Sequence, residues 1–299
     1  MRSHSRITLE QLSIFVAVAE REHITRAAAA VGLTPSAVSS AIRQLETQHG
    51  VQLLERIGRR VELSSAGRAF LPQARDVLAR TRSASLLLSD LGEGKTGEVA
   101  IYASQTIASY WLPPILTRFH AEHPGIDVHL IIGNTRSVSR AVLDGQAAVG
   151  FVEGVVDEPE LDSQLVGEDR LWVVTAPDHP WARMKALQPT DLADGSAWIL
   201  REAGSGTRSE FEAALGQLGV DVAALKITMT LPSNEAILSA VQSGPFASAV
   251  SALAAGPLTR LGVLANCPIE LPARGFSMLT HPGRHSSRAF HAFRRFCMP

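Results

Sequence analysis

Cysteine and long apolar runs are scarce in this chain of 299 residues. The two cysteines, Cys267 and Cys297, lie far apart, so we expect reduced structural thiols, with a redox switch as the lesser alternative. No stretch approaches the roughly 20 apolar residues that span a bilayer. No apolar segment follows Arg2 and Arg6 as it would in a signal peptide. We therefore expect a cytoplasmic protein.

The sequence also lacks motifs for catalysis and metal binding. The ten histidines form no cluster with cysteine or acidic residues at metal-ligand spacing, so no metal is expected. There is no Gly-x-Ser-x-Gly elbow, and no carboxylate pair stands out. We therefore expect no catalytic residues and no cofactor, which makes an enzyme the weaker alternative. With 45% hydrophobic and 19% charged residues, the chain can bury cores in two or three domains.

The segment from Thr25 to Gln48 has the pattern of two helices joined by a turn. A run of small residues precedes Gly32, which is a candidate for the end of the first helix. Thr34 can cap the second helix, and Pro35 can occupy its first position. Two such helices also occur in proteins that never bind nucleic acid. The second helix has one apolar face and one face that can bond to bases or phosphates: Val38, Ile42 and Leu45 on the first; Ser36, Ser39, Ser40, Arg43 and Gln44 on the second. This pattern predicts a helix-turn-helix that enters the DNA major groove.

The flanking segments favour DNA binding. Residues 9–19 supply an apolar face that completes a three-helix core, and residues 51–54 and 61–63 predict two short strands. The arginines at their tip can grip phosphate or enter the minor groove, with a solvated charge cluster as the alternative. The predicted DNA-binding residues are Thr34, Pro35, Ser36, Ser39, Ser40, Arg43, Arg56, Arg59 and Arg60.

The run from Ala28 to Ser39 carries a family resemblance that continues through Ile42, Leu45, Glu46, Gly50, residues 53–56, Arg60 and residues 63–67. This pattern resembles the amino-terminal domain of LysR-type transcriptional regulators. Pro35 stands where the family often has glutamine, and Leu54 where it often has phenylalanine. Direct base readout is therefore expected to rest on Ser36, Ser39, Ser40 and Arg43. The segment is only mildly basic, with no lysine before residue 66, so dimeric avidity is expected.

A long helix and a hinge are predicted after the winged domain of residues 1–65. Ser64 or Ser65 can cap a helix over residues 66–91, with a bend at Pro72. A core helix of the next domain is the alternative, but the resemblance implies a dimerisation helix. Residues 92–97, rich in glycine, read as a hinge.

Residues 98–299 alternate strands with helices, which indicates α/β units with parallel sheets. Strands are expected at 98–104, 126–133, 148–152, 170–176, 197–200, 226–231, 246–250, 269–271 and 276–280; helices at 107–123, 138–144, 207–218, 234–243 and 286–296. The fold class is therefore α/β, with an α-rich winged helix-turn-helix, a linker helix and a two-lobed effector domain. The first lobe is expected over about 98–166 and 269–299, and the second over about 167–268. The resemblance implies the fold of periplasmic binding proteins.

Three loops are expected to meet in the cleft between these lobes, because ligands bind at strand carboxyl ends near helix amino termini. The third, residues 201–208, follows a strand and opens a helix, so its N–H groups, hydroxyls and Arg208 can form an anion cradle. A plain glycine turn is the alternative, with Arg208 turned to solvent or to Glu212, and residues 233–235 act mainly as a helix cap. The predicted effector-binding residues are Ser104, Gln105, Thr106, Asn134, Thr135, Arg201, Ser205, Gly206, Thr207 and Arg208.

Together these features predict a regulator that reads an inverted-repeat promoter site in double-stranded DNA and senses a small anionic effector. It is expected to assemble as a homodimer or homotetramer, with contact to RNA polymerase as a further expectation and no membrane partner. The alternative is a solute-binding protein or an enzyme on the same two-lobed fold.

Overall fold

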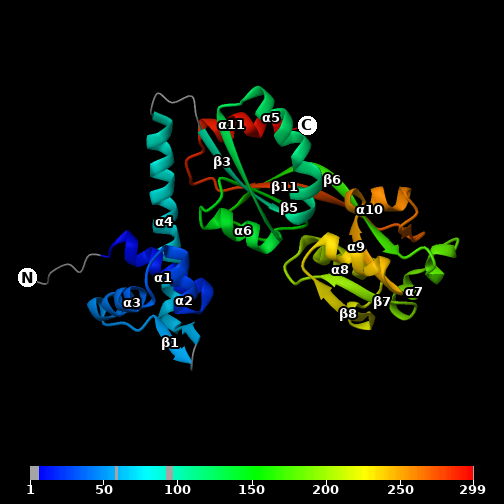
Figure 1. The fold of residues 1–299 in the computed structure, drawn as a ribbon, viewed down its shortest axis with the longest axis horizontal. Coiled ribbons are helices and arrows are strands. Elements are labelled where there is room, and N and C mark those ends of the chain that lie inside the picture. Colours follow the sequence, from blue (N-terminus) through cyan, green and yellow to red (C-terminus); the bar gives the residue numbers. More distant parts are fainter. Residues whose placement is uncertain (1–6, 58–59, 92–96, 299) are drawn as a thin grey trace, which may run out of the picture. The chain divides into compact units, whose positions relative to one another are not determined.

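The computed structural model describes residues 7–57, 60–91 and 97–298. The chain, drawn as a ribbon in Figure 1, divides into two compact units, Met1–Leu88 and Ser89–Pro299. Each unit has its own hydrophobic core. Among the described residues, no helix combines the length and the apolar character that crossing a membrane requires.

Local capping signals set the helix ends of the first unit. The helix α2 (Ile24–Val31) ends at Gly32, whose φ of 69° lies in the left-handed region that glycine adopts without strain. Thr34 Oγ1 accepts a hydrogen bond from the Ala37 N–H at 3.2 Å and so caps α3 (Pro35–His49). The predicted pair of helices and the turn between them are confirmed.

A helix before this pair and a hairpin after it complete the unit. The helix α1 (Leu9–Arg21) packs on both α2 and α3. The strands β1 (Leu54–Ile57) and β2 (Arg60–Leu63) pair in antiparallel register as a wing. The first wing strand begins at Leu54, so the expectation that residues 51–53 belong to it is wrong. Those residues instead connect α3 to the wing.

The long helix α4 (Ser65–Leu91) continues through Pro72, as predicted. Ser64 caps it, because the Ser64 hydroxyl accepts a hydrogen bond from the Gly67 N–H at 2.9 Å. Phe70 of α4 packs on Phe15 of α1, with ring centroids 5.3 Å apart. The amino-terminal part of α4 therefore belongs to the core of the winged domain.

The strands of the second unit are β3 (Gly97–Ser104), β4 (Ile126–Gly133), β5 (Val149–Glu153), β6 (Asp162–Thr175), β7 (Ala197–Arg201), β8 (Lys226–Leu231), β9 (Phe246–Ser251), β10 (Ala265–Asn266) and β11 (Ala273–Thr280). They form one sheet in the order β4-β3-β5-β11-β6-β9-β7-β8, with β10 paired to β6. β3 is parallel to β4 and β5, and β7 is parallel to β8 and β9. The sheet is nevertheless mixed, because β6 and β11 run antiparallel to their neighbours.

The helical segments of this unit are η1 (Ile107–Trp111, a π-helix), α5 (Leu112–Glu122), α6 (Thr135–Leu143), η2 (Pro180–Arg183), α7 (Pro189–Asp194), α8 (Gly206–Gln217), η3 (Val222–Ala224), α9 (Asn234–Gln242), α10 (Ala252–Arg260) and α11 (Arg288–Cys297). The single helix expected over 107–123 therefore opens as a π-helix. The expected strand at 269–271 is wrong, since these residues have no regular structure and β10 pairs with β6 instead. The helix α10 was not predicted.

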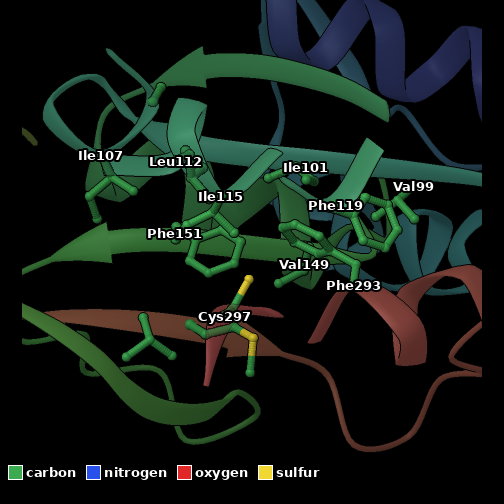
Figure 2. Close-up of a cluster of buried hydrophobic side chains, with 14 of the residues drawn as sticks. Val99, Ile101, Ile107, Leu112, Ile115, Phe119, Val149, Phe151, Phe293 and Cys297 are labelled. Atoms are coloured by element: carbon green, nitrogen blue, oxygen red, sulfur yellow. The ribbon is translucent and has the colours of Figure 1, made fainter. Parts of the chain in front are cut away.

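The first lobe consists of β3, β4 and β5 with α5, α6 and α11. Figure 1 shows α5 and α11 on one side of these strands and α6 on the other, and the buried clusters agree. Figure 2 shows the core under α5 and α11, where Phe119, Phe151 and Phe293 lie together. Cys297 is buried in this core.

The second lobe consists of β7, β8 and β9 with α8 and α9, and its cores lie on the two faces of these strands. The long strand β6 joins the lobes: residues 162–170 pair with β11, and residues 171–175 pair with β9. The carboxyl ends of β3, β4 and β7 consequently lie at the junction between the lobes, where the three predicted loops begin.

Candidate functional site

The outer face of α3 is polar, whereas its inner face is fully packed. Val38, Ile42 and Leu45 are buried, and Ser36, Ser40 and Arg43 are exposed. Of the other predicted residues, Thr34 and Pro35 are exposed, and Ser39 is partly buried. Because the Thr34 hydroxyl caps the helix and lies 3.0 Å from Ser36 Oγ, it serves the fold as well as the face.

The wing adds two exposed arginines, Arg56 on β1 and Arg60 on β2. Within the described residues, neither side chain forms an ion pair, and the same holds for Arg43. Arg59 lies outside the described residues. The exposed side of α3 and the wing therefore present three arginines that form no ion pair among the described residues, together with the hydroxyls of Ser36 and Ser40.

The three predicted loops of the second unit do come together. Gln105, after β3, accepts hydrogen bonds through Oε1 from the Asn234 N–H at 2.8 Å and from Arg201 Nη1 at 3.1 Å. Asn234 Nδ2 in turn donates to Thr106 Oγ1 at 3.0 Å. Side chains of the first lobe thus bond directly to β7 and α9 of the second lobe.

A second set of bonds crosses between the lobes at the start of α6. Asn134 caps α6 through its Oδ1 and donates from Nδ2 to Glu202 Oε1 at 3.1 Å. The Arg136 N–H donates to the Gly204 carbonyl at 3.2 Å. Thr135 Oγ1 donates to the Glu153 carbonyl at 3.1 Å, so Thr135 serves to fasten β5 to α6.

A buried charged group, which was not predicted from the sequence, lies beside the loops after β3 and β7. Glu153, at the end of β5, is 1% exposed, and its carboxylate accepts hydrogen bonds from Ser104 Oγ and from Thr207 Oγ1. Arg274 of β11 lies 3.8 Å from Glu153 and forms a 2.7 Å ion pair with Asp169 of β6. The partners are 49 to 121 positions apart in sequence, since Arg274 and Glu153 meet only through the strand order. One local signal was available: a glutamate ends the otherwise apolar run of β5.

Backbone N–H donors and a buried hydroxyl lie at the start of α8. Ser205 is the N-cap residue, yet its buried hydroxyl makes no capping bond, and the first N–H groups of a helix have no partner inside it. A Cβ on Gly206 would meet the Glu153 carbonyl at 2.3 Å, so only glycine lets α8 approach β5 this closely. The hydroxyl of Thr207, by contrast, is already occupied by Glu153 and Arg274.

The two predicted arginines of the third loop differ in their surroundings. Arg208 Nε lies 2.7 Å from Glu212 Oε1, and its Nη1 donates to the Arg201 carbonyl, which is the alternative arrangement expected from helical spacing. Arg201 is buried and pairs with the neighbouring Glu202. Burial alone would raise the pKa of Glu202, but hydrogen bonds from Arg201 and Asn134 outweigh that effect and lower it.

Tyr110 of η1 and Glu235 of α9 form a further contact between the lobes. Tyr110 donates from its hydroxyl to Glu235 Oε1 at 3.0 Å, and Gln105 Nε2 donates to the other carboxylate oxygen. Burial and the adjacent carboxylate raise the pKa of Tyr110 to about 12, so the phenol stays protonated and keeps donating. Ser233 caps α9, as predicted, and Glu235 adds the contact between lobes that the sequence left open.

Both units match models of the same protein family. Residues 9–68 match the bacterial regulatory helix-turn-helix protein, lysR family, and residues 92–299 match the LysR substrate binding domain. The chain belongs to the LysR family of transcriptional regulators. It is 34% identical over 297 residues to the uncharacterized HTH-type transcriptional regulator YeiE of Escherichia coli (strain K12), covering 98% of each chain.

Solved structures of LysR-type regulators share this fold. Full-length CbnR complexed with its target DNA has a TM-score of 0.65 at 22% identity, over 97% of this chain and 99% of that one. The regulatory domain of Synechocystis PCC6803 CcmR in complex with 2-PG has a TM-score of 0.62 at 27% identity, over 68% of this chain and 96% of that one. The protein is thus a LysR-type, DNA-binding regulator with an effector domain, and the resemblance read from residues 28–67 is confirmed.

Proposed function

We propose that this LysR-type regulator reads an inverted-repeat promoter site as a homo-oligomer and senses a small anionic metabolite between the lobes of its effector domain. For DNA reading, the observation that carries the proposal is the exposed polar face of α3, with Arg43 and the two wing arginines outside every ion pair of the described residues. CbnR, which shares the fold, is bound to DNA in its solved structure. Cytoplasmic location and contact with RNA polymerase stay predictions.

Assembly into a homodimer or homotetramer is proposed from α4. Leu88 and Leu91 are 71% and 69% exposed, and Val77 and Leu87 are also exposed, so the helix carries apolar surface that its own domain leaves uncovered. A two-fold dimer presents two recognition helices one DNA turn or a multiple of it apart, which is what an inverted repeat requires.

An anionic effector is proposed from the start of α8. Its N–H groups and the Ser205 hydroxyl are donors without an intrahelical partner, and the positive end of the helix dipole favours negative charge. The CcmR regulatory domain, with 27% identity, is bound to 2-PG. Regulation requires that the effector bind one arrangement of the oligomer more tightly than another, because allostery is a coupling free energy between two sites.

DNA reading is tested by Arg43→Ala in a gel-shift titration across a range of salt. If Arg43 reads a guanine, affinity for the operator falls by about 1–3 kcal/mol, and preference at one base pair relaxes. An equal loss on every sequence shows instead that Arg43 contacts phosphate alone.

The effector site is tested by Ser205→Ala, with Ser209→Ala as the matched control. The Ser209 hydroxyl donates to the Gly206 carbonyl within α8 and faces no ligand in the proposal. Thermal-shift titration with carboxylates, sulfate and phosphates should show an anion response that weakens in Ser205→Ala only. Equal responses of wild type and Ser205→Ala contradict the site. Thr207→Ala is avoided, because Thr207 bonds Glu153 and Arg274.

A further inference from the structure

An ion pair in the third loop joins two adjacent residues, Arg201 and Glu202. Arg201 Nε lies 2.8 Å from Glu202 Oε2, and Arg201 Nη2 lies 3.0 Å from Glu202 Oε1. Two parallel N–H···O bonds of this kind are the arrangement in which a guanidinium binds any carboxylate or phosphate. The arginine side chain is 2% exposed, whereas that of the glutamate is 28% exposed. The cation is therefore buried, and the anion on it is accessible from solvent.

The surroundings fix the arginine through partners other than the glutamate. Arg201 Nη1 also donates to Gln105 Oε1 at 3.1 Å and to Asn234 Oδ1 at 3.3 Å, so the guanidinium stays in place whichever anion it binds. Apart from Arg201, the side-chain donor to the Glu202 carboxylate is Asn134 Nδ2, from the first lobe. The glutamate thus occupies a position between a fixed cation of one lobe and an amide of the other.

We propose that Glu202 is an internal anion that occupies the guanidinium of Arg201 and that an oxyanion effector displaces. This inference rests on the proposed anion site and assigns its ligand chemistry: a carboxylate, sulfate or phosphate group that presents two oxygens to Arg201 and accepts a bond from Asn134. Glu202 is then an autoinhibitory contact, since the effector must compete with it.

Exchange of one anion for another avoids the main cost of opening such a site. A buried cation left without a partner is strongly destabilising, but the incoming oxyanion replaces the carboxylate on Arg201. The departing carboxylate is already partly exposed to water, and the oxyanion takes over the bonds from Arg201 and Asn134 that the carboxylate gives up. The backbone next to it turns at Gly204, whose φ of 94° suits glycine alone, and the Ser205 N–H bonds the Glu202 carbonyl at 3.1 Å. The loop can therefore keep its backbone while the side chain leaves.

Displacement also changes what joins the lobes. In the arrangement described above, the bridge from Asn134 to Arg201 runs through Glu202. In the occupied arrangement, the effector itself forms this bridge, so its size and shape set the separation of the two loops. Binding is thereby linked to the relation between the lobes, as a regulator requires.

The experiment compares sulfate and inorganic phosphate binding to the full-length protein by isothermal titration calorimetry and thermal shift. Glu202→Gln keeps the size of the side chain and removes its charge, so it should bind these anions at least tenfold more tightly than wild type. Glu270→Gln removes the same charge from an exposed site of the effector domain and should bind as wild type does. This control separates displacement from a general change in net charge.

A second variant keeps the proposal testable if Glu202→Gln folds poorly. Glu202→Asp keeps the charge beside Arg201 but shortens the side chain by one methylene, so its carboxylate no longer reaches both Arg201 and Asn134, and it should tighten anion binding by a smaller factor. If wild type binds the anions and neither variant binds them more tightly, Glu202 is no competitor, and the anion site stands without it. If no protein binds either anion at tens of millimolar and Ser205→Ala changes nothing, the proposed anion site and this inference both fall.

Discussion

At the residue scale, Glu46 shows how one side chain sets the position of the wing. Its Oε1 accepts hydrogen bonds from the Leu53 N–H at 2.7 Å and from the Leu54 N–H at 3.0 Å, so the end of α3 holds the start of β1. Glu46→Ala leaves two partly buried N–H groups without an acceptor and should lower the free energy of unfolding by about 1–3 kcal/mol.

Urea denaturation of the isolated full-length variants measures this loss. Glu46→Gln retains an oxygen acceptor and should recover part of the stability, and Glu55→Ala, at an exposed wing position, should change it little. A Glu46→Ala protein as stable as wild type, with unchanged operator affinity, would show that the wing is positioned by other contacts.

The two thiols are a second prediction at this scale. Burial raises the pKa of the Cys297 thiol to about 12, and burial also raises that of Cys267, against the opposing effect of a contact with Thr175. The thiolate is the reactive form, so both cysteines should resist Ellman's reagent at pH 8 in the folded protein and react after denaturation. Rapid modification of native protein would revive the redox alternative.

At the element scale, the contact between α4 and the segment that leads into the wing depends on one glycine. A Cβ at Gly67 would lie 2.0 Å from the Leu53 carbonyl oxygen, which is backbone and cannot move aside cheaply. Gly67→Ala should therefore destabilise the protein by about 1–3 kcal/mol through overpacking. Gly216 of α8 is the matched control, since no atom lies within 4 Å of its Cβ position.

Gly216→Ala should stabilise by about 0.5–1 kcal/mol, because it reduces the entropy of the unfolded chain at a helical position. Thermal unfolding of both variants gives the comparison. If Gly67→Ala proves as stable as Gly216→Ala, α4 and the wing are packed less tightly than described.

The elements themselves divide into those the sequence could predict and those it could not. Gly32, Thr34 and Pro35 act on their own neighbours, so the helix-turn-helix followed from short-range patterns. The bonds of Glu153 and Arg274 depend on which strands become adjacent, and no local pattern contains that information. For the same reason, the sequence predicted the three loops but not Glu153 and Glu202, whose carboxylates accept hydrogen bonds from side chains of these loops.

At the scale of the whole molecule, the low positive charge of the DNA-binding unit and the exposed apolar surface of α4 both favour DNA binding by more than one copy. The unit carries few cations and no lysine before residue 66, so one copy has little electrostatic affinity for phosphate. The exposed Leu88 and Leu91 offer a surface through which two copies could act together, and linking two sites can raise affinity by a factor of about 100 to 10,000.

Leu88→Asp should therefore yield a smaller assembly and lower operator affinity by at least a factor of about 100, because a charge at an apolar interface opposes association and removes this avidity. Sedimentation equilibrium and gel shift measure the two effects on the same samples. Leu261→Asp, at a 75% exposed position of the effector domain, is the matched control and should change neither. Since the unit folds around a core that excludes Leu88, its thermal stability should persist in the variant. Loss of DNA binding with an unchanged assembly mass would mean that α4 contributes to DNA contact and not to association. A decrease in both assembly mass and operator affinity would show that one weakly basic domain needs a second copy to bind the operator.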